Sequence, residues 1–233
     1  MSDLNLDFPY IICCVLAFIP AIVLHEVGHG FAAYKLGDPT AKNAGRLSLN
    51  PINHIDPFGT VLMPLLLMVM NMPVFGYAKP VPYNPMYFKN KRVGDFIVGM
   101  AGPLVNLIQA LIGALVAQIL YLTVWQATSG VAYEIANNIV FQYFFFYFLY
   151  LYVLYNLYLM VFNLIPVPPL DGSSIIALFV PERHLPTYYR IQQYALPIFF
   201  LVVLIVPYVF NVNPIGLLLQ ATAGNLFNLL MPL

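Results

Sequence analysis

The chain has 233 residues, of which 61% are hydrophobic, 15% aromatic and only 8% charged. Soluble domains carry about a quarter charged residues, so this composition excludes a water-soluble fold and predicts an integral membrane protein. The formal net charge is zero, and nothing in the composition favours a nucleic-acid-binding protein.

Five apolar segments and a less apolar sixth follow one another along the chain, and a bilayer crossing requires about 20 residues. The second is interrupted by Pro64 and Pro73, and the polar side chains of the last leave open whether it spans the membrane or lies at its interface. The segments are residues 9–34, 58–75, 93–125, 139–164, 191–210 and 215–233. The expected fold is an all-α polytopic membrane protein with about five to six transmembrane segments.

We expect one membrane-embedded domain, residues 1–233, with a core at about 10–180 and C-terminal helices at about 191–233. All nine Lys and Arg residues lie in three connections between the apolar segments. Positive charge accumulates on the cytoplasmic side of membrane proteins, so these connections are expected there and the N-terminus outside. The second segment has basic residues on both flanks, so it is expected to be a re-entrant element.

The first two basic connections, residues 41–57 and 76–91, are rich in Pro, Asn and Gly. Such a composition favours turns and short extended pieces over helix. We therefore expect short membrane-associated strands in these two connections.

The first apolar segment contains the sequence His25-Glu26-Val27-Gly28-His29, an HExxH motif. Residues four apart lie on one face of a helix, so the two imidazoles can bind one metal ion. Glu26 lies about 100° further round the helix and can act as a general base without being a ligand. Two His and one Glu in a span cost a few kcal/mol of insertion free energy, and a metal bond is the expected compensation.

The strongest candidate for a third ligand is Asp171, in the sequence Asn163-Leu-Ile-Pro-Val-Pro-Pro-Leu-Asp-Gly172 at the end of the fourth segment. Three prolines end the helix there, and Gly172 frees the backbone beside the carboxylate. The predicted topology places His25, His29 and Asp171 at a similar depth. Two His and one carboxylate with an open fourth position are typical of catalytic zinc, although an interfacial turn also explains Asp171.

The HExxH motif in one span and the NxxPxxPLDG sequence at the end of a later one together resemble the site-2 protease family of intramembrane zinc metalloproteases. The resemblance covers about residues 10–180. Ala101-Gly-Pro-Leu-Val-Asn106 resembles the GPxxN element of that family, and residues 50–60 (NPINHIDPFGT) are similar to a loop of a short prokaryotic branch. The sequence lacks the PDZ or cystathionine-synthase-like (CBS) domain inserted in longer members of the family.

The resemblance implies one Zn2+ per chain, held by His25, His29 and Asp171, with Glu26 as the general base. It implies a catalytic core of three helices, formed by the first, third and fourth segments, and extended elements that receive an unwound substrate. The implied substrate is a membrane protein, cleaved in the lipid bilayer within or near one of its transmembrane segments.

Three further polar residues are candidates for substrate binding or for support of the ligands. Asn106 can donate hydrogen bonds to the substrate backbone or to a developing oxyanion, or it can join two helices. Asn163 has the same two interpretations, and support of the ligands is favoured. His54, in a basic connection, can contact the zinc site, gate access to it, or cap a turn between Asn53 and Asp56.

The sequence therefore predicts a multi-pass zinc metalloendopeptidase of a prokaryotic cell membrane, with the active site toward the cytoplasm. Two other functions stay open. A divalent-metal transporter also carries His and carboxylate residues within its spans, although it needs ligands distributed along a path. An inactive relative that binds membrane proteins is the second, although the intact Glu26 argues against it. No nucleic-acid partner is expected, and a homo-oligomer stays open.

Overall fold

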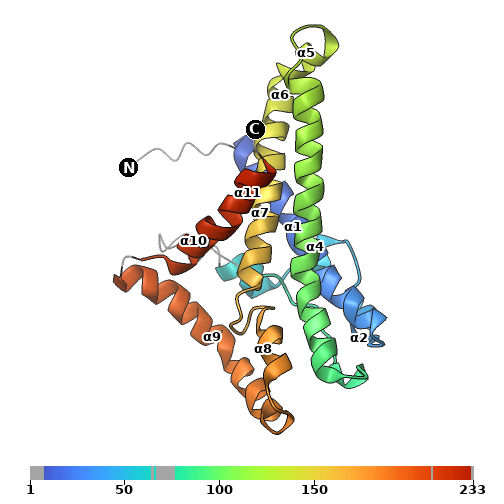
Figure 1. Ribbon diagram of the computed structural model, residues 1–233, viewed down its shortest axis with the longest axis vertical. Coiled ribbons are helices and arrows are strands. Elements are labelled where there is room, and N and C mark those ends of the chain that lie inside the picture. The colour runs from blue at the N-terminus through green and yellow to red at the C-terminus, as the bar shows by residue number, and fades with distance from the viewer. Residues whose placement is uncertain (1–7, 64–65, 67–76, 211, 232–233) are drawn as a thin grey trace.

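Three long helices form the body of the protein in the computed structural model, which describes residues 8–63, 66, 77–210 and 212–231. These helices are α1 (Phe8–Lys35), α4 (Lys91–Leu120) and α7 (Tyr150–Asn163). Each of them contacts the other two, and we call them the three-helix core (Figure 1). The predicted catalytic core of three helices corresponds to this arrangement.

The remaining elements lie at the two ends of the three-helix core and beside it (Figure 1). The other α-helices are α2 (Thr40–Asn43), α5 (Gly130–Ala136), α6 (Ile139–Gln142), α8 (Ser173–Phe179), α9 (Leu185–Phe210), α10 (Pro214–Leu219) and α11 (Asn225–Leu230). Short 3-10 helices are η1 (Pro51–His54), η3 (Pro85–Tyr87) and η6 (Glu182–His184). Stretches of π-helix are η2 (Pro57–Leu62), η4 (Tyr121–Trp125), η5 (Tyr143–Leu149) and η7 (Gln220–Gly224).

Three helical stretches among the described residues are long and apolar enough to cross a membrane, namely Pro9–Lys35, Lys91–Trp125 and Ile139–Asn163. They coincide with the predicted first, third and fourth segments to within two residues at each end. The predicted total of five to six spans is not confirmed. Helix α9 covers the predicted fifth segment but begins earlier, at Leu185, and α10, η7 and α11 cover most of the sixth.

The predicted re-entrant segment, residues 58–75, falls mostly outside the described residues. Its described beginning is π-helical, over Pro57–Leu62. The predicted strands are not confirmed, since the described part of the chain contains no β-strand. Residues 77–84 are nevertheless non-helical, and we call them the clamp segment because of the contacts described below.

Small residues allow the three-helix core to pack closely. On α4, Ala110, Ala114 and Ala117 are buried against Val153 and Leu157 of α7. Lipid offers no hydrophobic force between helices, so close van der Waals contact between small residues is what holds such spans together.

The contact between α1 and α4 depends in the same way on a glycine. A methyl group at Gly28 would lie 2.9 Å from a Val105 methyl and 3.2 Å from the Ala101 carbonyl oxygen. The two helices can approach this closely only because residue 28 has no side chain.

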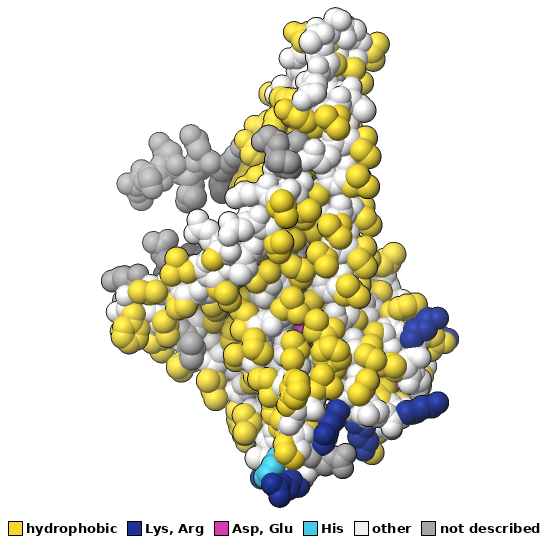
Figure 2. All heavy atoms as spheres, viewed as in Figure 1, with side chains coloured by type: hydrophobic (Ala, Val, Ile, Leu, Met, Phe, Trp, Pro, Cys, Tyr) yellow, Lys and Arg dark blue, Asp and Glu magenta, His cyan; other side chains and the backbone are white. Residues whose placement is uncertain are grey.

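The surface of the molecule is apolar along the core and basic at one end. Figure 2 shows hydrophobic side chains over most of one face and Lys and Arg side chains only near its lower end. Large apolar side chains such as Leu115 and Leu122 are 61% and 63% exposed. A surface of this kind suits contact with lipid, with the basic end at the interface.

Candidate metal centre

His25 and His29 lie one turn apart on α1 and are buried against α4, with 5% and 9% of each residue exposed. Their Nε2 atoms are 3.0 Å apart. The Asp171 Oδ2 atom lies 3.2 Å from Nε2 of His25 and 3.3 Å from Nε2 of His29. The structure thus brings together the three residues that the sequence predicts as metal ligands, although Asp171 follows His25 by almost 150 residues.

The loop between α7 and α8 aims Asp171 at the two imidazoles. After α7 ends at Asn163, the chain folds back so that the Gly172 amide donates to the Asn163 carbonyl at 2.6 Å. A side chain at Gly172 would lie 2.6 Å from the Ile165 carbonyl oxygen. Gly172 has an ordinary negative φ of −57°, so glycine is needed there for close approach and not, as the sequence suggested, for backbone freedom.

Both imidazoles are held with Nδ1 protonated. His25 Nδ1 lies 2.5 Å from the Asn106 amide oxygen, and His29 Nδ1 lies 2.7 Å from the Val98 carbonyl oxygen. These oxygens only accept hydrogen bonds, so each Nδ1 must donate, and Nε2 on the other side of each ring is left as the atom that can bind a metal. That is the tautomer a metal needs, with the partner on the far nitrogen fixing the ring orientation.

The donor set fits zinc. Two Nε2 atoms and a carboxylate oxygen face one another, and the buried Asp171 Oδ2 has no hydrogen-bond donor other than these imidazoles close to it. A buried carboxylate oxygen without a partner costs several kcal/mol, and a cation shared by the three donors removes that cost. Two imidazoles and one carboxylate form a common ligand set of catalytic zinc, with a fourth position for water or substrate.

The absence of a side chain at Gly102 of α4 leaves space for the imidazoles of His25 and His29. A methyl group on Gly102 would lie 2.6 Å from Cε1 of both His25 and His29. Gly102 belongs to the AGPLVN sequence, which therefore serves the site twice, through the missing side chain of Gly102 and through the amide of Asn106.

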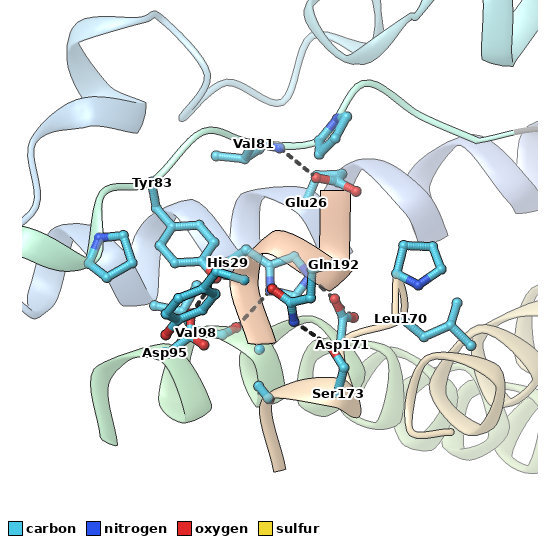
Figure 3. A pocket seen from close by; sticks show the side chains of 16 residues that line it. Glu26, His29, Val81, Tyr83, Asp95, Val98, Leu170, Asp171, Ser173 and Gln192 are labelled. Atoms are coloured by element: carbon cyan, nitrogen blue, oxygen red, sulfur yellow. Dashed lines mark hydrogen bonds and ion pairs between the residues drawn. The ribbon is translucent and has the colours of Figure 1, made fainter. Parts of the chain in front are cut away.

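Glu26 lies beside the ligands and opens on a cavity of about 460 Å³ that His29 and Asp171 also line (Figure 3). Its Oε2 accepts a 2.9 Å hydrogen bond from the Val81 amide. The clamp segment and the start of α4 form two walls of the cavity, and the α7–α8 loop, α8 and α9 complete it. The predicted general base thus faces a space that lies next to the three candidate metal ligands.

The residue pattern at this centre is shared with a known family. The model of peptidase family M50 matches residues 13–206. The chain belongs to peptidase family M50. This is the site-2 protease family that the sequence motifs resemble, and its cofactor is zinc.

Curated relatives of this M50 chain carry names of the same kind. It is 39% identical over 199 residues to the protein named "Putative zinc metalloprotease YwhC" of Bacillus subtilis (strain 168), covering 85% of this chain and 81% of that one. It is 27% identical over 167 residues to "Putative zinc metalloprotease Rip2" of Mycolicibacterium smegmatis, covering 71% of this chain and 56% of that one. No solved structure matches the chain at a significant level.

Together with the three apolar helices, membership of M50 makes the protein a multi-pass membrane metalloprotease, and membrane proteins are its expected substrates.

The three remaining predicted residues lie at different distances from the M50 site. Asn106 contacts His25 directly, as described above. The Asn163 side chain donates to the Leu159 carbonyl of its own helix at 3.0 Å, so only its backbone carbonyl holds the α7–α8 loop.

His54 is 2% exposed, and its Nε2 donates to the Ser48 carbonyl at 2.8 Å. It does not line the described cavity. Its own carbonyl accepts from the Lys79 amide at 2.9 Å, which attaches the loop to the clamp segment.

The clamp segment is fixed to the rest of the M50 chain through its backbone. The Tyr77 amide donates to the Gly59 carbonyl at 3.1 Å, and the Asn84 amide donates to Asp38 Oδ2 at 2.6 Å. The guanidinium of Arg46, a residue that is 6% exposed, donates to the Lys79 carbonyl. These contacts hold Val81 where its amide meets Glu26.

Sequence reasoning missed two polar contacts beside the site. The Tyr83 hydroxyl donates to Asp95 Oδ1 at 2.5 Å, and both residues line the cavity. Asn156 of α7 is fully buried and accepts from the Asn106 amide at 2.8 Å. The signal in each case is a polar side chain inside a predicted apolar span, for Asp95 in the third segment and for Asn156 in the fourth.

Proposed function

We propose that this M50 metalloprotease hydrolyses peptide bonds in or near transmembrane segments of other membrane proteins. The observation that carries the proposal is the position of Glu26, which lies beside His25, His29 and Asp171 and faces a cavity within an apolar helical protein. A segment that already lies in the bilayer has direct access to a site among the apolar helices.

His25, His29 and Asp171 would hold one Zn2+. When bound, zinc supplies a Lewis acid that polarises the scissile carbonyl and makes water a better nucleophile at neutral pH. Glu26 takes the proton from the attacking water as the new C–O bond forms, and later gives it to the amine of the leaving peptide as the C–N bond breaks. The Val81 amide holds one carboxylate oxygen of Glu26 during both transfers.

The substrate must enter the site as an extended chain, because a helix keeps its carbonyl groups in internal hydrogen bonds. The clamp segment borders the cavity with Pro80 and Val81. Between Lys79 and Pro82 it has no amide to offer, since the Lys79 and Val81 amides are already bonded and the two prolines have none. A substrate strand beside these residues would therefore donate its own N–H groups to carbonyl oxygens of the clamp segment.

The test is cleavage of a labelled single-span substrate by the full chain in membranes. Glu26→Gln should retain about one zinc per chain and lose cleavage by roughly 10²–10⁴-fold, the usual contribution of a general acid–base group. Asp171→Ala should lose zinc as well. Undiminished cleavage by Glu26→Gln would refute the proposal.

Orientation in the membrane forms part of the proposal. The basic end of the molecule carries the connections that the sequence places in the cytoplasm, so we place the N-terminus outside and the zinc site toward the cytoplasm of a prokaryotic cell. Reporter fusions after α5 and after α8 test it, because the two connections should report opposite sides of the membrane.

The alternative function of a metal transporter is disfavoured. Among the described residues, His25, His29 and Asp171 form one cluster, and no second group of three such side chains continues a path away from it.

A further inference from the structure

A chain of buried amides runs behind the zinc ligand His25 and links all three helices of the core. Asn106 of α4 and Asn156 of α7 are both 0% exposed. The Asn106 amide nitrogen donates to Asn156 Oδ1 at 2.8 Å and to the Ala21 carbonyl of α1 at 3.1 Å. The Asn156 amide nitrogen donates to the Tyr152 carbonyl, one turn earlier on its own helix, at 2.9 Å.

The direction of every hydrogen bond in this chain is determined by two backbone carbonyls. The Tyr152 carbonyl only accepts, so Asn156 must turn its NH₂ group toward it and its oxygen toward Asn106. Asn106 then faces two oxygens, those of Asn156 and Ala21, and must turn its NH₂ group toward them. A flipped amide would bring oxygen against oxygen with no proton between them.

The consequence reaches the metal. With its NH₂ group committed, Asn106 presents its oxygen to His25 Nδ1, which must then carry the proton. His25 Nε2 is left as a lone pair directed at the site of Asp171 and His29. Asn156 touches none of the three candidate ligands, yet together with the Ala21 carbonyl it fixes the orientation of Asn106 and so determines which nitrogen of His25 can bind a cation.

We infer that Asn156 is a positioning residue for zinc, acting through Asn106 on the tautomer and ring orientation of His25. The inference rests on the proposed function only in requiring zinc on His25, and it does not depend on which substrate is cleaved. The burial of Asn106 and Asn156 supports the inference, since two fully buried amides between apolar spans cost free energy unless each of their polar atoms is hydrogen-bonded.

The test is a double-mutant cycle on zinc affinity, measured by chelator competition on the purified full chain. Asn106→Ala and Asn156→Ala should each weaken zinc binding, by roughly 10–100-fold and about tenfold, the range found for partners of metal ligands. Because Asn156 acts through Asn106, the double variant should bind zinc no more weakly than Asn106→Ala alone. The visible spectrum of the Co2+-loaded protein should change in all three.

Two further variants separate positioning from packing. Asn156→Asp, as the neutral acid, keeps an oxygen toward Asn106 and a hydroxyl that can donate to the Tyr152 carbonyl, so it should recover most of the lost affinity. Gln118→Ala is the matched control, because this α4 amide bonds to the Leu230 carbonyl at 3.4 Å, away from the site, and its loss should leave zinc affinity unchanged. If Asn156→Ala does not fold, Asn156→Leu, which fills the volume, replaces it in the cycle.

Unchanged zinc affinity on removing the Asn156 amide would overturn the inference. So would losses that multiply in the double variant, or an Asn156→Asp protein as weak as Asn156→Ala. These outcomes are distinct from a failure of the proposed function, in which the unmodified chain would bind no zinc or Glu26→Gln would still cleave.

Discussion

The backbone amide of Val81 donates a 2.9 Å hydrogen bond to Oε2 of Glu26, and the two residues are 55 positions apart in the chain. The proposed general base is therefore held by the clamp segment and not by its own helix. The clamp segment is in turn fixed by Arg46 and by the His54 carbonyl. Residues that do not contact the proposed metal site thus determine the position of the Glu26 carboxylate, the proposed proton acceptor.

Removing that amide should lower the rate of cleavage without removing zinc. Val81→Pro deletes the N–H in a segment that already has prolines on both sides. A hydrogen bond to a charged group contributes about 1.5–3 kcal/mol, so kcat should fall by roughly 10–100-fold while zinc content stays near one per chain. Val81→Ala keeps the N–H and should lose much less. Equal rates for the two variants would show that the contact has no part in the reaction.

A side chain at Gly102 should destroy the metal site while leaving the helices in place. In Gly102→Ala the new methyl group would overlap both imidazoles, so the rings must turn away from Asp171. We expect zinc content to fall well below one per chain in elemental analysis. Gly224→Ala is the control, because the nearest atom to a methyl group there is 3.8 Å away. A Gly102→Ala protein with full zinc content would contradict the geometry.

The pair of Tyr83 and Asp95 should contribute to stability. Tyr83→Phe keeps the ring that stacks on Phe88 but leaves the 5%-exposed Asp95 without its donor. An unpaired buried acceptor costs about 1–3 kcal/mol, so the thermal midpoint in detergent should fall. Tyr87→Phe, at a residue that is 53% exposed, should leave it unchanged. Identical midpoints for the two variants would show that the pair contributes nothing.

The same pair predicts a pH dependence. Burial, with the Asp95 carboxylate as a second cause, raises the pKa of Tyr83 above its ordinary value of about 10. The folded protein therefore keeps a proton that the unfolded chain releases, so this contribution to stability is complete below about pH 10 and is lost as the pH rises further. Thermal midpoints of the unmodified protein and Tyr83→Phe should converge above that pH.

Withdrawing zinc should lower stability as well as activity. Without the cation the Asp171 carboxylate has an oxygen that is buried and has no hydrogen-bond partner. A ligand present at about 1,000 times its Kd stabilises by about 4 kcal/mol, so a strong chelator should lower the thermal midpoint, and added Zn2+ should restore it. Asp171→Ala, which lacks the third ligand, should show no response to the chelator. If the chelator leaves the thermal midpoint of the unmodified chain unchanged, zinc does not stabilise the fold.

The parts of the structure that sequence predicts well are those encoded by residue type over a short range. Long apolar runs located the three candidate spans, and the spacing of His25 and His29 predicted a shared helix face. Helix α9 begins six residues before the predicted apolar segment, because its first residues, Leu185–Arg190, include the polar Thr187 and the charged Arg190 and so do not belong to the apolar run.

The contacts that support the site are less visible in the sequence. A backbone amide such as that of Val81 has no residue type to mark it, so its contact with Glu26 depends on the path of the clamp segment. The pairing of Asn106 with Asn156 depends on how far each helix is rotated about its axis, which apolar composition does not determine. His54 shows the converse, because a residue type typical of catalysis is buried between Ser48 and the clamp segment.

The distance along the chain between the ligands has a consequence for biosynthesis. Two of the proposed ligands are on α1, and the third follows only after α4 and α7 have been synthesised. A nascent chain that ends before Asp171 offers two imidazoles and no carboxylate, which is too few donors for tight binding of the ion. Metal binding, and the proteolytic activity proposed to depend on it, is therefore acquired only when all three helices of the core are already present.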